Sequence, residues 1–449
     1  MGKATTQGNR LRLRAGTLAG LTAMAVGPAL AADAGGDAWA DDTWGEEEES
    51  GLPFDVSGFV ELAGGYHLRD NEALDDDYNL AELRGRLEIS GHWQRLDYRV
   101  KADGVADGVE DEVRGELREA RASFPVGERL DMRVGRQVLT WGTGDLLFIN
   151  DLFPKDWQSF LTGRDSEYLK APSDAVRGTW YGDAVTLDVV WTPVFEPDVY
   201  PNGDRLSYFD TQRGRQTAAS LPTEDPEDFP DDGELATRLS GRIGSTELAG
   251  YFYRGFFPRP GKQIGTGNNT EFTHARLNAY GASVRDRIGP GIASAEVGYY
   301  DSVDYDSDRA MQVPNDEARL LLGYDWELVA NLNVGFQYYV EWLQDYDELK
   351  DAYARSTQAD ERYRPEEYRD IITNRLTYAI WRDNLVWSLF TYYSPADEDY
   401  YARPSVHYRV SDELSYTLGG NLFGGDADHT FYGQFEQDSN LYGRIRYRF

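Results

Sequence analysis

LYGRIRYRF, the sequence of residues 441–449, alternates strictly between two kinds of side chain. Every second position, from Leu441 to Phe449, is aliphatic, aromatic or Gly, and the positions between are Tyr442 and three Arg. A strand that crosses a bilayer shows one face to hydrocarbon and the other to a lumen, so its side chains have a period of two. Because any half-buried strand alternates, this stretch predicts a transmembrane β-barrel only if the rest of the chain agrees.

The N-terminal segment indicates export from the cytoplasm. Four basic residues precede an apolar stretch at positions 15–30 that ends in small residues. This layout is typical of a cleavable secretory signal, and a transmembrane anchor needs about 20 apolar residues. We expect residues 1–31 to be a signal peptide and residues 32–52 to be a disordered acidic periplasmic leader. Residues 53–449 then form the barrel.

Composition narrows the function classes further. Removal of residues 1–31 takes away four positive charges and no acidic residue, which changes the formal net charge from −33 to −37. This acidity excludes a nucleic-acid binder. The chain has no Cys, and its five His are scattered, so we expect no disulfide, metal site or cofactor. Because no later segment is apolar enough for a helical span, a membrane form has to be a closed barrel.

Alternating segments recur along the chain with short and long connections in turn. Eight short turns and nine long connections predict eighteen antiparallel strands, with short periplasmic turns, long extracellular loops and both chain ends on the periplasmic side. Sixteen strands is the alternative, because the patterns at 235–243 and 402–410 are weak. A soluble all-β sandwich also alternates, but does not account for the signal and the terminal strand. The short turns are expected near Gln94, Gly127, Gly182, Gly244, Gly289, Val329, Arg382 and Ser411. The long connections are expected at 67–78, 104–111, 140–173, 193–234, 256–271, 301–316, 343–367, 394–403 and 423–438.

The lumen-facing positions of the strands at both chain ends are rich in Arg. Because the last strand of a barrel pairs with the first, these strands form one continuous arc of wall. The arc either guides anions from one guanidinium to the next, or braces the barrel by pairing with Glu88, Asp97, Asp103 and Glu116. The opposite wall, assigned to strands within 318–342, 384–393 and 413–422, is expected to carry hydroxyl and amide groups. The predicted pore-lining residues are Arg84, Arg86, Arg99, Lys101, Arg114, Arg118, Arg133, Arg444, Arg446 and Arg448.

The connection at 140–173 is too apolar for a free surface loop. We expect it to fold into the barrel mouth as a constriction, the alternative being packing on a neighbouring subunit. The connection at 193–234 is acidic and Pro-rich, and we expect it to be mobile. The candidate constriction residues are Trp141, Asp145, Asp151, Lys155, Asp156 and Arg164.

Residues 135–156, GRQVLTWGTGDLLFINDLFPKD, resemble a segment of an uncharacterised porin-like family of proteobacterial outer-membrane barrels, related in outline to alginate-export channels. The terminal Phe449 resembles the C-terminal signature that the outer-membrane insertion machinery reads. The resemblance implies an eighteen-stranded or similar barrel that moves a solute. Alternation alone turns Arg136 towards lipid, so we expect a bulge or an exit from the membrane there. The residues that the resemblance places at the mouth are Arg136, Gln137, Trp141, Gly142, Asp145, Pro154 and Asp156.

These observations together predict a passive channel of porin or exporter type in the outer membrane of a Gram-negative bacterium, for small or polymeric hydrophilic solutes, preferentially anionic ones, that pass along the arginine arc. The expected partners are lipid and lipopolysaccharide, the insertion machinery and the solute, with a homo-oligomer as a further option. One alternative is a structural or docking barrel for a periplasmic transport machine. The other is an outer-membrane hydrolase, which the absence of a Gly-x-Ser-x-Gly motif disfavours, so we expect no enzymatic activity.

Overall fold

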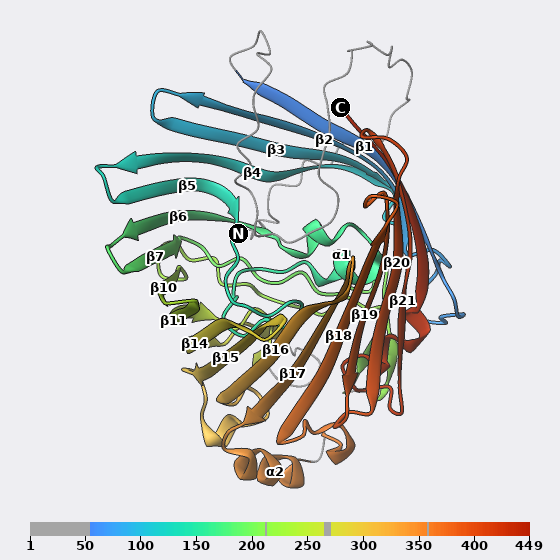
Figure 1. Cartoon of the computed structure of the whole chain (residues 1–449). Coiled ribbons are helices and arrows are strands. Elements are labelled where there is room, and N and C mark those ends of the chain that lie inside the picture. The colour runs from blue at the N-terminus through green and yellow to red at the C-terminus, as the bar shows by residue number, and fades with distance from the viewer. Residues whose placement is uncertain (1–53, 212, 265–270, 357–358) are drawn as a thin grey trace, which may run out of the picture.

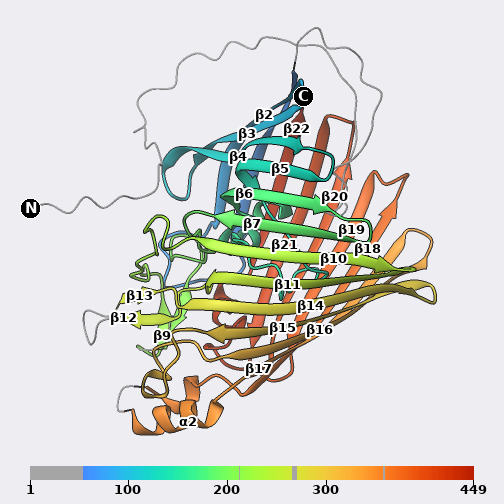
Figure 2. The ribbon, with the colours of Figure 1, turned by 90° about the vertical axis from the view of Figure 1, so that its left-hand side faces the viewer.

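The computed structural model describes residues 54–449 except 212, 265–270 and 357–358. Its eighteen long strands form one closed antiparallel barrel (Figure 1 and, at right angles, Figure 2). The barrel closes where β1 pairs with both β2 and β22. The predicted fold class is therefore confirmed, with eighteen strands rather than sixteen. The predicted signal peptide and leader lie outside the described residues.

The strands follow one another around the barrel in chain order, and the smaller elements lie in the long connections. The barrel strands are β1 (Asp55–His67), β2 (Leu80–Trp93), β3 (Leu96–Asp107), β4 (Glu112–Val126), β5 (Leu130–Val138), β6 (Pro172–Tyr181), β7 (Val185–Thr192), β10 (Glu234–Ile243), β11 (Thr246–Phe256), β14 (Arg276–Ile288), β15 (Gly291–Ser302), β16 (Glu317–Val329), β17 (Leu332–Leu343), β18 (Tyr368–Ile380), β19 (Leu385–Ser394), β20 (Asp399–Arg409), β21 (Leu414–Gly425) and β22 (Asn440–Arg448). The connections contain α1 (Trp157–Thr162), η1 (Ser166–Leu169), β8 (Tyr208–Asp210), β9 (Arg215–Thr217), β12 (Lys262–Ile264), β13 (Glu271–Thr273), η3 (Ser307–Arg309), α2 (Tyr346–Arg355), η4 (Glu361–Tyr363) and η5 (Gly433–Asp438).

The short turns lie at the predicted places. Gly244 and Gly289 each begin a two-residue hairpin loop and have φ of 65° and 61°. Tight hairpins need positive φ because only such turns match the twist of the flanking strands. Two long connections are much shorter than predicted, because β3 continues to Asp107 and β20 begins at Asp399.

The weak pattern of β20 has a local cause. Its pairing with β21 includes Ala402 and Ser405 but skips the two positions between them, and one of these is Pro404. Proline has no N–H to donate to a ladder. The neighbouring strand β19 still pairs with Pro404 through Leu389. The strand is therefore continuous, although its sequence reads as interrupted.

A β-bulge lies between β3 and β4. The register shifts between Lys101 and Ala102, so Arg118 is the extra residue of β4. A bulge inserts one residue and changes the phase of alternation. Arg118 and Glu119 are consequently both buried although they are consecutive. This bulge explains the irregular alternation of β4.

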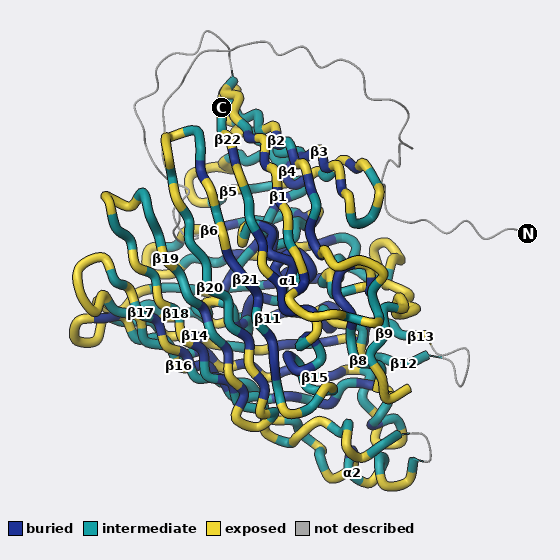
Figure 3. Tube along the Cα trace, turned by 90° about the vertical axis from the view of Figure 1, so that its right-hand side faces the viewer, coloured by how far each residue is buried: buried dark blue, intermediate teal, exposed yellow. Residues whose placement is uncertain are grey.

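The hydrophobic core lies inside the lumen rather than behind the wall. Its fully buried members include Ile149, Phe160 and Leu206, which belong to connections and not to barrel strands. Figure 3 shows this buried chain around α1 within the ring of strands. No helix among the described residues is long and apolar enough to span a membrane.

Candidate functional site

The connection between β5 and β6, residues 139–171, is here called the lumen loop. It contains the short helices α1 and η1. Asp156 caps α1 by accepting a hydrogen bond from the backbone N–H of Ser159 at 2.7 Å. Gly163 ends α1 with a φ of 92° and lies so close to the ring of Tyr442 that a Cβ there would be 2.3 Å from the ring. The helix therefore ends in direct contact with the barrel wall.

One end of the lumen loop is anchored to the arginine arc. The Tyr168 hydroxyl donates to Asp103 at 2.7 Å and accepts from Arg86 at 2.7 Å. The carboxylate of Asp165 pairs with Arg444 at 2.8 Å and Arg446 at 3.0 Å. Burial opposes ionisation of Asp165, but these two guanidinium groups hold its pKa below the usual value. The arc therefore binds carboxylates of the chain itself.

The other end of the loop is anchored to β15. The buried carboxylate of Glu296 accepts hydrogen bonds from the backbone N–H groups of Thr143 and Gly144, the second at 3.0 Å. It also accepts from the Asn150 side chain at 3.0 Å. Three donors from one loop thus converge on one carboxylate, a charge-assisted arrangement stronger than neutral hydrogen bonds.

The two anchors lie on opposite sides of the barrel. Counting strand by strand around the closed sheet, β15 is the ninth of eighteen positions from β2 in either direction. The lumen loop therefore crosses the full width of the lumen. A third contact reaches β18, where Arg375 donates to Asp145 at 2.7 Å. This ion pair is more exposed than the other anchors.

The six predicted constriction residues have two different roles. Asp145 and Arg164 reach the wall, the second through a salt bridge to Glu82 on β2. The other four organise the loop itself. Trp141 packs edge-on against Phe153, Asp151 and Lys155 form a buried pair at 3.0 Å, and Asp156 caps α1.

In the half of the arc that faces the long loops, the predicted pore-lining cations are offset by carboxylates. Arg84 is buried and pairs with Asp103 at 3.0 Å and Glu116 at 2.8 Å. Arg114 pairs with Asp107 at 2.8 Å. Three other arc cations hold the lumen loop: Arg86, Arg444 and Arg446. Arg118 donates to the backbone oxygen of Lys170 at 2.8 Å. These contacts therefore fix the lumen loop to the wall and leave these cations bound to groups of the protein itself.

The half of the arc near the short turns is less neutralised. Lys101 pairs with Glu88 at 3.5 Å and with Glu119 at 3.1 Å, and Arg99 also contacts Glu88 at 3.3 Å. Arg133 and Arg448 form no ion pair with a carboxylate in the part of the chain that the structure describes. Both are partly exposed. Positive charge is therefore in excess in this half.

The predicted opposite wall needs two corrections. β21 pairs with β22, so its hydroxyl and amide groups lie beside the arc and not opposite it. The wall of β16–β18 also carries charges that an amide wall lacks, because Arg319, Glu317 and Glu341 all point inward and interact. Composition does not reveal the position of β21, because its place beside the arc follows from the closure of the barrel through β22.

The residues at the mouth lie where β5 ends. Arg136 remains on the outer face and pairs with Asp174 at 3.1 Å. Its register with β6 is continuous, so no bulge occurs, and β5 ends at Val138. Gln137 points inward and donates to the backbone of β6, while Gly142 has a φ of 89°. The backbone oxygen of Pro154 accepts from the N–H of Ala171, which closes the base of the loop.

The residues of the site that were not predicted include Asp165, Tyr168, Glu296 and Arg375. Only Glu296 has a clear signal, because it is the single charge on the inward face in a β15 segment of small and apolar residues. The others are ordinary polar residues of a loop or wall whose partners are far away in sequence. Among the described residues, no cluster of three or more His or acidic side chains is arranged to hold a metal ion.

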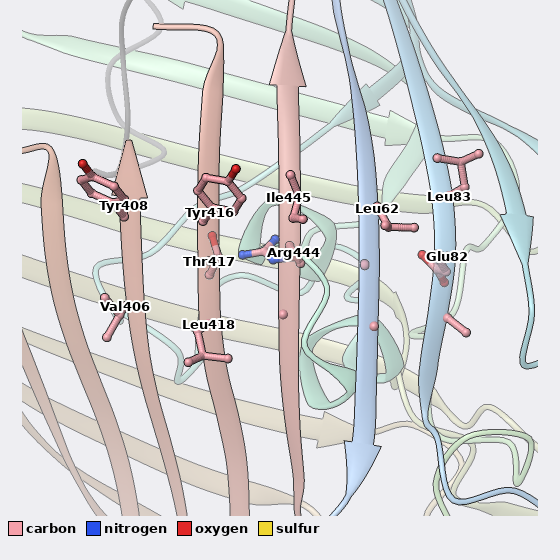
Figure 4. Close-up of a pocket in the computed structure, with 14 residues that line it drawn as sticks. Leu62, Glu82, Leu83, Val406, Tyr408, Tyr416, Thr417, Leu418, Arg444 and Ile445 are labelled. Atoms are coloured by element: carbon pink, nitrogen blue, oxygen red, sulfur yellow. The ribbon is translucent and has the colours of Figure 1, made fainter. Parts of the chain in front are cut away.

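A separate depression of about 750 Å³ lies on the outer face at the closure of the barrel (Figure 4). Its floor is Ala81, Gly64 and Gly443, which are neighbours across β2, β1 and β22. Leu62 and Ile445 stand beside it on the same face. An apolar hollow on the outer surface has no access to the lumen, so it is not part of the pore.

Comparisons with known proteins agree with this architecture. A family model described as a protein of unknown function (DUF1302) matches residues 110–349, more than half of the chain. OccAB3 of Acinetobacter baumannii has a TM-score of 0.52 at 9% identity, covering 88% of this chain and 99% of that one. OccD3 (OpdP) of Pseudomonas aeruginosa has a TM-score of 0.50 at 11% identity, covering 88% and 91%. None of the curated proteins compared matches. The expected porin-like fold is confirmed, and the relation to alginate-export channels finds no support.

Proposed function

We propose that this chain, which belongs to the DUF1302 family of proteins of unknown function, is a passive channel in the outer membrane of a Gram-negative bacterium. Small hydrophilic solutes pass through it, and anions pass preferentially. The observation that carries the proposal is the lumen loop, which spans the closed barrel from β2 to β15. A loop held at both walls narrows a lumen and selects what passes.

The preference for anions is assigned to the arc near the short turns. In the other half, the arginines are engaged by carboxylates of the wall and the lumen loop. Near the short turns, Arg133 and Arg448 form no ion pair among the described residues and are partly exposed. Unpaired cations along a low-dielectric wall attract anions and raise their local concentration. Lipid and lipopolysaccharide would contact the outer face, and the insertion machinery would read β22.

The alternative is a structural or docking barrel for a periplasmic machine. It is favoured by the apolar core that the lumen loop builds inside the barrel, around Ile149 and Phe160. A lumen filled to this extent would transmit no ions. The two functions therefore differ in one measurable property, the conductance of the folded barrel.

The experiment is single-channel recording of the refolded, full-length mature chain in a planar bilayer under a KCl gradient. Discrete steps with a reversal potential on the anion side support the proposal. The double variant Arg133→Gln/Arg448→Gln is expected to move the reversal potential towards cations. The matched control, Arg95→Gln/Arg382→Gln, removes two exposed turn cations at the same end of the barrel. Absence of steps from a heat-modifiable barrel would refute the channel, and an equal shift in both double variants would refute the role of the arc.

A further inference from the structure

A polar cavity of about 470 Å³ lies on the stretch of wall that follows the arginine arc, between β6 and β14. It is lined by inward-facing residues of β10, β11 and β14, by the turn between β6 and β7, and by the start of the lumen loop at Gly142 and Thr143. It therefore lies between the loop and the short-turn end of the barrel. Its volume is in the range of ligand pockets, about 300–1,000 Å³.

The cavity has an excess of positive charge. Three guanidinium groups line it, those of Arg238, Arg242 and Arg285, against the carboxylates of Glu247 and Asp183. Glu247 forms a salt bridge with Arg242. Asp183 is at the rim and pairs with Arg129, outside the cavity, at 2.9 Å.

In the part of the chain that the structure describes, Arg238 and Arg285 are left without a bound carboxylate, because Glu247, which lies opposite Arg285 in the register of β11 and β14, binds Arg242. Neither forms an ion pair with a carboxylate among the described residues. The inward carboxylate beside Arg238 in the register is Asp188. Arg177 and Thr179 both donate to Asp188 at 2.7 Å, so this carboxylate is already engaged.

Polar atoms with unused hydrogen-bonding capacity come together around these cations. Arg238 Nε and Thr143 Oγ1 are buried and have no hydrogen-bond partner in the described part of the chain. The Tyr251 and Ser283 hydroxyls are 3.0 Å apart and share one hydrogen bond, in which either can be the donor. The hydroxyl that accepts in this bond keeps its own proton for another acceptor. Buried polar groups in folded proteins are nearly always paired, so unpaired ones that line a cavity are groups that water or a polar ligand satisfies.

We propose that this cavity is a binding site for small organic carboxylates that carry several hydroxyl groups, such as sugar acids. The carboxylate binds Arg238 and Arg285, because the planar guanidinium fork matches a carboxylate. The hydroxyl groups of the ligand meet Thr143, Tyr251 and Ser283, which both donate and accept hydrogen bonds. The inference rests on the proposed channel function and deepens it by naming the class of solute and the place where it pauses.

The test is isothermal titration of the refolded mature chain in detergent micelles with gluconate. Sorbitol, with the same hydroxyl pattern but no carboxylate, and acetate, without the hydroxyl groups, are the comparison probes. We expect gluconate to bind at least tenfold more tightly than either probe. Equal affinity for gluconate and acetate would overturn the role of the hydroxyl groups, and equal affinity for gluconate and sorbitol would overturn the role of the cations.

Variants locate the binding. Arg238→Gln/Arg285→Gln is expected to lower gluconate affinity at least tenfold, while Arg95→Gln/Arg382→Gln, on exposed turns, leaves it unchanged. If the first double variant does not fold, Arg238→Lys and Arg285→Lys keep the charge without the planar fork, and each is expected to weaken binding at least threefold. Unchanged affinity in the folded variants would overturn the site.

Bilayer recording of the same preparations separates this inference from the proposed function. Gluconate binding without ion conductance would support the cavity and refute the channel. Conductance without gluconate binding would support the channel and refute the cavity. Conductance that gluconate interrupts in the wild type, but not in the Arg238/Arg285 double variant, would support both.

Discussion

Replacement of Glu296 by Ala is expected to release the far end of the lumen loop. Three donors of the loop converge on this carboxylate, from the backbone of Thr143 and Gly144 and from the side chain of Asn150. A hydrogen bond to a charged group contributes about 1.5–3 kcal/mol. Because the freed donors regain part of this from lumenal water, we take about 3 kcal/mol for the whole anchor. At about 1.4 kcal/mol per tenfold change, the population of the released loop should rise roughly a hundredfold.

The assay uses the absence of Cys from the chain. A Cys introduced at Leu147, which is buried in the loop core, reacts with a lumen-permeant thiol reagent only when the loop is released. Its labelling rate should rise roughly a hundredfold in Glu296→Ala and less than tenfold in Glu296→Gln, which keeps an acceptor for the backbone donors. A Cys at the exposed Ser245 gives the intrinsic rate. A rise of less than threefold in Glu296→Ala would refute Glu296 as the anchor.

Three further outcomes are expected. Deletion of residues 145–165, which removes most of the lumen loop, should raise the unit conductance, and an unchanged step size in a folded barrel would contradict the constriction. Phe160 is buried against Tyr401 with ring centroids 6.0 Å apart, so Phe160→Ala should destabilise loop docking by about 3–5 kcal/mol; protease nicking of the loop measures this, with Phe160→Leu as the milder control. Burial raises the pKa of Asp438 to about 7, against an ordinary value of about 3.9. The folded chain therefore favours the protonated acid, and this contribution to stability is complete below about pH 4 and is lost as the pH rises through 7. The thermal midpoint should fall between pH 5 and 8 in the wild type and less in Asp438→Asn, and equal falls would contradict this assignment.

The alternation of residues was sufficient to predict the strands, because it depends only on which face meets lipid. It failed locally where the backbone departs from a regular ladder, at the bulge of Arg118 and at Pro404. The apolar composition of the lumen loop was also sufficient to predict that its side chains are buried. It did not predict which strands of the wall they contact.

The sequence alone could not predict which residues pair with one another in the site. Glu296 and Asn150 are 146 positions apart, and Arg375 and Asp145 are 230 apart. Nothing local to either residue indicates the other, because their meeting is set by the diameter and order of the closed barrel. The division of the arginine arc into a neutralised half and a half with excess charge depends on these same distant contacts.

The anchor of the lumen loop on Arg444 and Arg446 has a consequence for the order in which the protein assembles. Neighbouring hairpins form between residues close in sequence, but Arg446 also binds Glu61, 385 positions away, and Asp165 of the lumen loop. Contacts of such separation carry the largest chain-closure cost and form late. Asp165 can therefore find both of its partners only after the final strand has been made and seated beside β1. The contacts of the lumen loop with β2, β3 and β15 do not need the final strand. Docking of the loop is therefore completed, rather than begun, when β22 closes the barrel.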